Sequence, residues 1–437
     1  MQARLALNIL MSNAPKLSQS LSAYISVTFA YWSFMLTDGA VRMLVLFHFH
    51  LLGFSPIELA TIFLLYEFMG VITNLYAGYI AARFGLNSTL YAGLGFQIIA
   101  LTALALYSEA LLSSAGLASF SLAYVVISQG LSGIAKDLTK MSAKSAVKWL
   151  APDSDGTLFQ WVAFLTGSKN AVKGSGFLLG AALLTFIGFK SALWSLVALL
   201  LVVLLLLVFI MPSGLTTKNK SAKLKQVFSV NSHINWLSGA RLFLFGARDV
   251  WFVVGIPIFF YSILSDGSLS QNKTAFFQIG FFMSFWIILY GATQAITPKL
   301  LNSESRSRYS IIRITKMAVL FLAVILAVLT AVTAANLLSD RALFYFIVIG
   351  LFGFGFVFAI NSSLHSYLIL AFSDAERVTM DVGFYYMSNA AGRLLGTFLS
   401  GVSYQFGGLP ACLACATILC LFSWLLTFPL ANLQKQG

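Results

Sequence analysis

The chain has 437 residues, of which 59% are hydrophobic and only 9% are charged, and its formal net charge is +13 at pH 7. A soluble domain carries about 25% charged residues, so this composition excludes a soluble globular protein. It favours a protein whose partner is the lipid bilayer, and in such a protein a positive excess reflects cytoplasmic loops rather than nucleic-acid binding.

Apolar segments near the length that a bilayer-spanning helix needs, about 20 residues, follow one another along the chain. Because a chain in lipid must satisfy its own backbone polar groups, each segment is predicted to be an α-helix. The sequence therefore predicts an all-α polytopic membrane protein with twelve transmembrane helices, near residues 23–50, 57–81, 88–108, 116–137, 158–187, 191–211, 234–263, 274–297, 311–334, 342–371, 381–404 and 409–430.

The longest polar connector, residues 212–233, divides the chain into two predicted six-helix halves, residues 1–211 and 234–437. With twelve spans, the connector and both termini lie on the same side of the membrane. Most Lys and Arg residues of the loops are on that side, whereas the loops on the opposite side hold Lys190, Lys273 and Arg341. Cytoplasmic loops carry the excess of basic residues in membrane proteins. Both termini and the connector are therefore predicted to be cytoplasmic.

The two halves look like a sequence repeat. When residues 150–188 are moved forward by 220 positions, Gly176 meets Gly396 and Lys173 meets Arg393 in the middle of a predicted span. Parallel repeats of six spans are typical of the major facilitator architecture, which binds its substrate near the bilayer midplane between the halves.

The segment between the second and third predicted spans, GYIAARFGLN at 78–87, carries a partial motif. It resembles the major facilitator loop signature Gly-x-x-x-Asp-Arg-x-Gly-Arg-Lys at Gly78, Arg83 and Gly85, with Ala82 at the position of the acid. The resemblance implies the same major facilitator fold.

Several predicted spans carry ionisable residues, which are costly inside a bilayer and mark substrate pathways. Basic residues outnumber acidic ones there, and a buried cation without a partner anion is strongly unfavourable. An anionic substrate is therefore predicted. The candidate substrate-binding residues are Arg42, Lys169, Lys173, Arg241, Arg248, Asn361, His365 and Arg393.

Arg42 and Arg248 lie at corresponding depths of the first and seventh spans, and a guanidinium grips phosphate-like oxyanions with two parallel hydrogen bonds. This pattern is similar to the organophosphate branch of the major facilitators, in which spans one and seven each supply an Arg. Two alternatives stay open. The long side chains could reach the membrane interface, and Asp38 and Arg42, four residues apart, could form a salt bridge within one helix.

Three acidic residues in the spans, Asp38, Glu67 and Asp249, are candidates for proton coupling. The sequence contains no nucleotide-binding motif and no catalytic triad, so we expect a secondary transporter that is not an enzyme and needs no cofactor. Cys412, Cys415 and Cys420 fan across one apolar helix with no base nearby, so we expect a structural role rather than a metal site.

Long stretches of the sequence resemble the ArsJ-type organoarsenical efflux permeases, among them TDGAVRMLVLFHFHLLGFSPIELATIFLLYEF (37–68), GSKNAVKGSGFLLG (167–180) and RLFLFGARDVWFVVGIP (241–257). The resemblance implies export of 1-arseno-3-phosphoglycerate across the inner membrane, which gives arsenate resistance. It also implies a functional partnership with a glyceraldehyde-3-phosphate dehydrogenase that makes this substrate. An organophosphate or phosphate exchanger of the major facilitator type stays open as an alternative.

Overall fold

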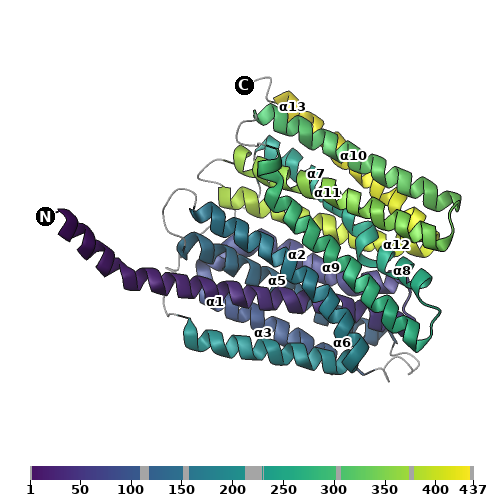
Figure 1. Cartoon of the computed structure of the whole chain (residues 1–437), viewed down its shortest axis with the longest axis horizontal. Coiled ribbons are helices and arrows are strands. Elements are labelled where there is room, and N and C mark those ends of the chain that lie inside the picture. The colour runs from purple at the N-terminus through teal and green to yellow at the C-terminus, as the bar shows by residue number, and fades with distance from the viewer. Residues whose placement is uncertain are drawn as a thin grey trace.

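The structure is a computed structural model that describes residues 2–108, 118–150, 157–211, 229, 231–301, 307–373 and 378–433. Within these ranges the chain is a bundle of long helices without a β-strand, and the ends of the described chain, at α1 and α13, lie at the same end of the bundle (Figure 1). Most of the predicted connector, residues 212–228 and 230, lies outside the described residues.

The helices before the connector make up the first half. They are α1 (Gln2–Leu51), α2 (Pro56–Phe84), α3 (Leu86–Ala105), α5 (Ala118–Leu150) and α6 (Thr157–Ile210). The second half holds α7 (Ser232–Val250), the π-helical turn η2 (Trp251–Gly255), α8 (Ile256–Leu264), α9 (Leu269–Leu300), α10 (Arg308–Ala335), α11 (Asp340–Phe372), α12 (Val378–Leu426) and α13 (Phe428–Leu433).

Two of the longest helices break at glycine. Gly188 in α6 has φ 76°, and Gly408 in α12 has φ 61°, a backbone conformation that suits glycine because it has no Cβ. Each break reverses the chain where the sequence predicts a loop between two spans. Helices α6 and α12 therefore supply two predicted spans each.

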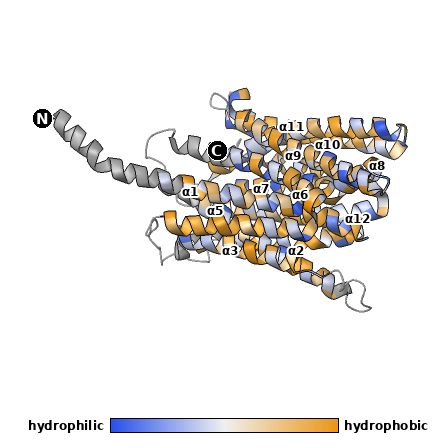
Figure 2. Ribbon diagram, turned by 60° about the horizontal axis from the view of Figure 1, so that its bottom comes forward, coloured by the Kyte–Doolittle hydropathy of each residue, from blue (hydrophilic) through white to orange (hydrophobic). Residues whose placement is uncertain are grey.

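In the described part of the chain, nine helical segments are long and apolar enough to cross a membrane, and α6 and α12 are among them. Helix α5 completes the predicted set, although Lys136, Asp137 and Lys140 interrupt its apolar stretch. Counting α6 and α12 twice and adding α5 gives the twelve predicted spans, so the predicted fold class is confirmed. Figure 2 shows hydrophobic residues along most of α3, α10 and α11, and the exposed Leu205 and Phe209 on α6 present the apolar surface that lipid requires.

Some boundaries differ from the prediction. Helix α1 begins at Gln2 instead of near residue 23, and α2 continues to Phe84, so most of the 78–87 signature is helix rather than loop. Gly85, with φ 82°, turns the chain into α3. The seventh span contains η2, which the sequence did not predict. The hydroxyl of Ser400 accepts hydrogen bonds from the Val254 and Gly255 N–H groups of this turn, at 3.1 and 3.3 Å.

Close glycine contacts join equivalent helices in each half. A Cβ at Gly176 of α6 would lie 2.4 Å from the Leu36 carbonyl oxygen of α1, and a Cβ at Gly392 of α12 would lie 2.0 Å from the Leu242 carbonyl oxygen of α7. Small residues spaced four apart let membrane helices approach in this way. The first and fifth spans, and likewise the seventh and eleventh, are therefore close enough for their side chains to pair.

The two halves meet along α2 with α12 and along α6 with α9. At the end of the bundle away from the termini, the Phe47 and Phe276 rings stack with their centroids 4.5 Å apart. There the Ile57 N–H also donates to the Gln405 side chain, at 3.2 Å. Polar residues halfway along these helices consequently lie at the junction of the halves.

Candidate functional site

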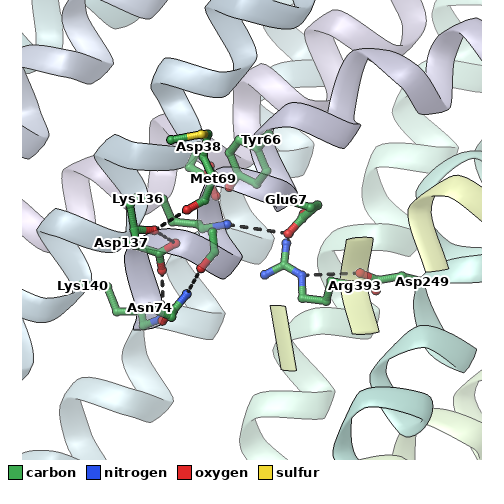
Figure 3. A network of polar contacts seen from close by, with 12 residues as sticks. Asp38, Tyr66, Glu67, Met69, Asn74, Lys136, Asp137, Lys140, Asp249 and Arg393 are labelled. Atoms are coloured by element: carbon green, nitrogen blue, oxygen red, sulfur yellow. Dashed lines mark hydrogen bonds and ion pairs between the residues drawn. The ribbon is translucent and has the colours of Figure 1, made fainter. Parts of the chain in front are cut away.

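Charged side chains from both halves converge at this junction, where Figure 3 shows most of them. We call this group the central network. Its cations are Arg42, Lys136, Lys140, Lys173, Arg248 and Arg393, and its carboxylates are Asp38, Glu67, Asp137 and Asp249.

Glu67 of α2 is fully buried and binds several cations at once. Its Oε1 accepts a hydrogen bond from Arg42 Nη2 of α1 at 2.9 Å, and the same oxygen pairs with Arg393 of α12. Its Oε2 lies 3.8 Å from Lys136 Nζ of α5. Glu67 therefore ties three helices to α2, and its bond with Arg393 is an ion pair between the halves (Figure 3).

Arg393 continues the network into the second half. Its Nε lies 3.4 Å from Asp249 Oδ2 of α7, and Asp249 Oδ1 accepts a hydrogen bond of 2.6 Å from the Nε of its neighbour Arg248. Positive and negative groups thus alternate from Arg42 through Glu67, Arg393 and Asp249 to Arg248. Loss of one charged side chain would therefore leave each of its neighbours in this chain with one ion-pair partner fewer.

Lys173 and Arg393, the residues that the sequence repeat aligns, make equivalent contacts. Lys173 of α6 pairs with Asp38 of α1 at 2.6 Å, as Arg393 of α12 pairs with Asp249 of α7. The Tyr66 hydroxyl donates to the other oxygen of Asp38. Each half therefore places one cation of its fifth helix against an acid of its first helix.

A polar arm extends from the network along α2 and α5. Lys140 Nζ donates to Asp137 at 2.9 Å and to the Asn74 side chain at 2.6 Å, and it also lies 5.3 Å from the centroid of the Tyr386 ring in the other half. One helical turn away, Lys136 lies 3.9 Å from the centroid of the Tyr66 ring. This arm provides additional positive charge on the side of the chain termini.

The central network has more positive than negative charge, since six cations face four carboxylates and leave a surplus of two. Its cations also keep some exposed surface, 16% of the side chain for Lys173 and 18% for Arg393, although they lie deep in an apolar bundle. Exposed cations at this depth are the groups that an entering anion would meet. The arrangement can therefore hold an oxyanion.

The remaining predicted site residues lie beside this network. Lys169 is half-buried one turn before Lys173. Arg241 of α7 is bound to Asn389 and Ser362, and the fully buried Asn361 and His365 lie on α11 near Ser362. Apart from Lys169, the predicted residues thus fall either in the central network or in a group around Arg241.

One sequence expectation needs correction. The salt bridge considered between Asp38 and Arg42 is not formed, because each side chain pairs with another helix, Asp38 with Lys173 and Arg42 with Glu67. Arg42 and Arg248, the arginines predicted to grip the substrate from opposite halves, lie at the two ends of the alternating chain, with Glu67, Arg393 and Asp249 between them. These pairings arise from helix packing.

Sequence reasoning did not place Lys136, Tyr66 or Asp137 in the site. The Gly-x-x-x-Gly spacings at 176–180 and 392–396 could have signalled which helices pack closely. Among the described residues, no group of three or more His, Cys, Asp or Glu residues is arranged to hold a metal ion. Cys412 and Cys420 are buried free thiols and Cys415 is a partly exposed one.

Comparisons with known proteins agree with this architecture. A family model described as Major Facilitator Superfamily matches residues 21–369. The structure is similar to a bacterial homologue of the iron transporter ferroportin in its inward-facing state, with a TM-score of 0.68, 14% sequence identity and coverage of 95% of this chain and 99% of that one. The outward-facing state of such a homologue gives a TM-score of 0.64 at 14% identity, covering 94% and 99%. No curated protein matches the sequence.

Proposed function

Because the chain belongs to the major facilitator superfamily, whose members are transporters, we propose that it exports an anionic organoarsenical, 1-arseno-3-phosphoglycerate, from the cytoplasm. The observation that carries this proposal is the positive surplus of the central network at the junction of the halves. An anion with several charges offsets that surplus, whereas a metal dication would be repelled by it. The extended resemblance of the sequence to ArsJ-type permeases supports the arsenic-containing substrate.

The geometry supports a mechanism in which the substrate competes with carboxylates for the same cations. Arg42 and Arg393 share one oxygen of Glu67, so each guanidinium keeps N–H groups that this oxygen does not use. Phosphate and arsenate oxygens accept hydrogen bonds from such groups in pairs. Substrate bound there would weaken the Glu67–Arg393 pair, which joins the halves, and would so allow the halves to move against each other.

We place the termini in the cytoplasm and the protein in the inner membrane, as the distribution of basic loops indicates. At the end of the bundle away from the termini the halves contact each other through Phe47 with Phe276 and Ile57 with Gln405. In the proposed orientation these contacts lie on the outer side, which suits the loading of a cytoplasmic substrate. A glyceraldehyde-3-phosphate dehydrogenase would supply the substrate. Breakdown of the exported substrate outside the cell would release arsenate.

Export against a gradient needs a source of energy, and we propose antiport with protons, with Asp38, Glu67 and Asp249 as the candidate carriers. Each of them is buried and paired with a cation. Antiport requires that the substrate and the proton are bound in turn, so the protein would return to its cytoplasm-facing state with a proton on one of these carboxylates after the substrate has left. Uptake into everted vesicles should then fall when an uncoupler collapses the proton gradient, and undiminished uptake would rule out proton coupling.

The function is tested with everted membrane vesicles, whose cytoplasmic face is outside. The medium contains glyceraldehyde 3-phosphate, NAD⁺, arsenate and purified glyceraldehyde-3-phosphate dehydrogenase, and the arsenic retained in the vesicles is measured by mass spectrometry. We expect uptake that requires both the dehydrogenase and the protein. The matched control omits the dehydrogenase.

The same vesicles distinguish transport of the organoarsenical from transport of an organophosphate or phosphate. Phosphate and arsenate have nearly the same shape, so the central network would also suit an organophosphate or phosphate exchanger. Uptake of labelled 3-phosphoglycerate or phosphate with no uptake of arsenic would favour the exchanger. Absence of uptake for all of these anions would contradict the proposed function.

A further inference from the structure

Arg241 differs from the other intramembrane arginines in having no carboxylate partner among the described residues. Arg42, Arg248 and Arg393 each pair with Glu67 or Asp249. Arg241 is only 5% exposed, yet its Nε donates to the Asn389 side chain at 3.1 Å and its Nη1 donates to Ser362 Oγ and O at 2.9 and 3.2 Å. These neutral acceptors and the Phe245 ring, whose centroid lies 3.9 Å from Arg241 Cζ, hold the guanidinium in place without supplying a negative charge.

Hydrogen-bond donors exceed acceptors around this guanidinium. Besides Arg241, the Tyr290 hydroxyl and the Gln294 amide are within hydrogen-bonding distance of Ser362 Oγ, at 3.2 and 3.0 Å. A hydroxyl oxygen accepts two hydrogen bonds, so even if Ser362 donates its own hydrogen to Tyr290, the Tyr290 hydrogen is left over. The Nη2 group of Arg241 also makes no hydrogen bond to a described residue. The Tyr290 hydroxyl and the Arg241 Nη2 group can therefore each donate a hydrogen bond to a further acceptor.

Unsatisfied polar side chains lie next to this group on α11. Asn361 and His365 are fully buried, and neither the amide of Asn361 nor either ring nitrogen of His365 has a hydrogen-bond partner in the described structure. His365 follows Ser362 by three residues and Asn361 by four, so its side chain neighbours both of them on the surface of α11. About nine in ten buried polar groups in proteins are bonded, so these four unbonded atoms form an unusual group of unused donors and acceptors.

The Arg241 group lies close to the central network. Asn389, which accepts from Arg241, precedes Arg393 by one turn of α12, or about 6 Å along the axis. Arg241 precedes Arg248 by two turns of α7, or about 10 Å. A three-carbon chain with an oxyanion group at each end is about 7 Å long at ordinary bond lengths. One such molecule therefore has the length to reach both groups.

A polar chain also connects the Arg241 group to the first half. Gln294 of α9, which bonds to Ser362, accepts a hydrogen bond of 3.3 Å from the Asn170 amide of α6. Asn170 lies between the predicted site residues Lys169 and Lys173 on the same helix. Arg241 is thus connected to the first half through Ser362, Gln294 and Asn170.

We propose that Arg241, together with Asn361 and His365, forms a second anion subsite, which holds one end of a substrate whose other anionic end binds the central network. This subsite rests on the proposed function, since it assigns the second charge of the same substrate. It explains why Arg241 lacks an acid partner: the substrate supplies the anion. It also selects substrates with two anionic ends over those with one.

The test compares two stable ligands that share a phosphate and a three-carbon chain. 3-Phosphoglycerate has a carboxylate at its other end, and glycerol 3-phosphate has a neutral hydroxyl there. Their affinities for the purified full-length protein are measured by isothermal titration calorimetry. We expect the wild type to prefer 3-phosphoglycerate about tenfold or more, because a charge-assisted hydrogen bond distinguishes the two.

Arg241→Gln should remove this preference and leave the affinity for glycerol 3-phosphate within about twofold. Asn361→Ala, a change that keeps every charge, should reduce the preference in part, and it tests the subsite if the Arg241 variant fails to fold. The matched control is Arg341→Gln, which removes an exposed arginine of the same half. A preference that persists in Arg241→Gln and Asn361→Ala would overturn the subsite.

The remaining outcomes separate the subsite from the function. An equal loss of affinity for both ligands in Arg241→Gln would make Arg241 part of a single site and would overturn a separate subsite. A wild type that binds both ligands equally well would also overturn the subsite while the proposed function stands. A wild type that binds neither ligand would contradict both.

Discussion

Arg393 and Arg241 lie near each other in the second half, but Arg393 has acidic partners and Arg241 has neutral ones. Arg393 lies between Glu67 and Asp249, whereas Arg241 is bound to the neutral side chains of Asn389 and Ser362. A cation held by acids is stable in the empty protein and exchanges its partners when an anion arrives. A cation without an acidic partner gains an opposite charge only when the anionic ligand binds. On the function and subsite proposed above, the central network would serve conformational change and the Arg241 group would serve substrate selection.

The largest effect is expected from Glu67→Gln, which removes the negative charge that Arg42, Arg393 and Lys136 share. The surplus of the central network would rise from two to three. Breaking a buried ion pair costs about 3–5 kcal/mol, so the variant should lose transport and unfold at a lower temperature. Vesicle uptake and thermal melting of the purified protein check this. A variant that melts and transports like the wild type would show that Glu67 is not the hub of the network.

The next largest effect concerns the two arginines at the ends of the alternating chain. Arg42→Gln and Arg248→Gln should each abolish arsenate resistance while the protein still reaches the membrane. Arg→Lys at either position should also impair export, because an ammonium lacks the planar fork that binds an oxyanion with two hydrogen bonds. Resistance is measured as growth on arsenate, with immunoblots of the membrane fraction as the control. Normal resistance in both Gln variants would refute their role.

A smaller effect is expected from the pair in the first half that mirrors Arg393 and Asp249. Lys173→Ala should weaken the binding of 3-phosphoglycerate, and it leaves the buried Asp38 with only the Tyr66 hydroxyl. Adding Asp38→Asn should restore part of the lost stability, because it removes the uncompensated carboxylate, but it should not restore binding. A double-mutant cycle of melting and binding separates the two roles. Additive losses of stability would show that the two residues do not interact.

The sequence predicted the twelve spans and seven of the ten charged residues of the central network, all except Lys136, Lys140 and Asp137, because hydropathy and charge are properties of single segments. It did not predict the partners of those charges. Lys173 reaches Asp38, and not a group of its own helix, because α1 and α6 approach at Gly176. The break at Gly188 fell where a loop was predicted, but the π-helical turn at Trp251–Gly255 depends on Ser400, which is distant in sequence.

The smallest effect is expected from the cysteines. The Cys412 thiol packs against the position where Gly255 has no Cβ, and it accepts a hydrogen bond of 3.2 Å from Ser403, so it fills space beside the π-helical turn. A variant with Cys412, Cys415 and Cys420 all changed to Ala or Ser should still confer arsenate resistance. Complete loss of transport in a folded and inserted variant would indicate a site for trivalent arsenic.

Equilibrium binding of 3-phosphoglycerate to the wild type and to Arg393→Gln shows whether the positive surplus between the halves receives an anion. Arg393 joins the halves through Glu67 and has no role in the Arg241 group. We expect saturable binding to the wild type that weakens as salt is added, because salt screens charges. We expect no measurable binding to Arg393→Gln and unchanged binding to Arg341→Gln. Binding of equal strength in the wild type and in Arg393→Gln, or no binding to the wild type, would contradict this expectation.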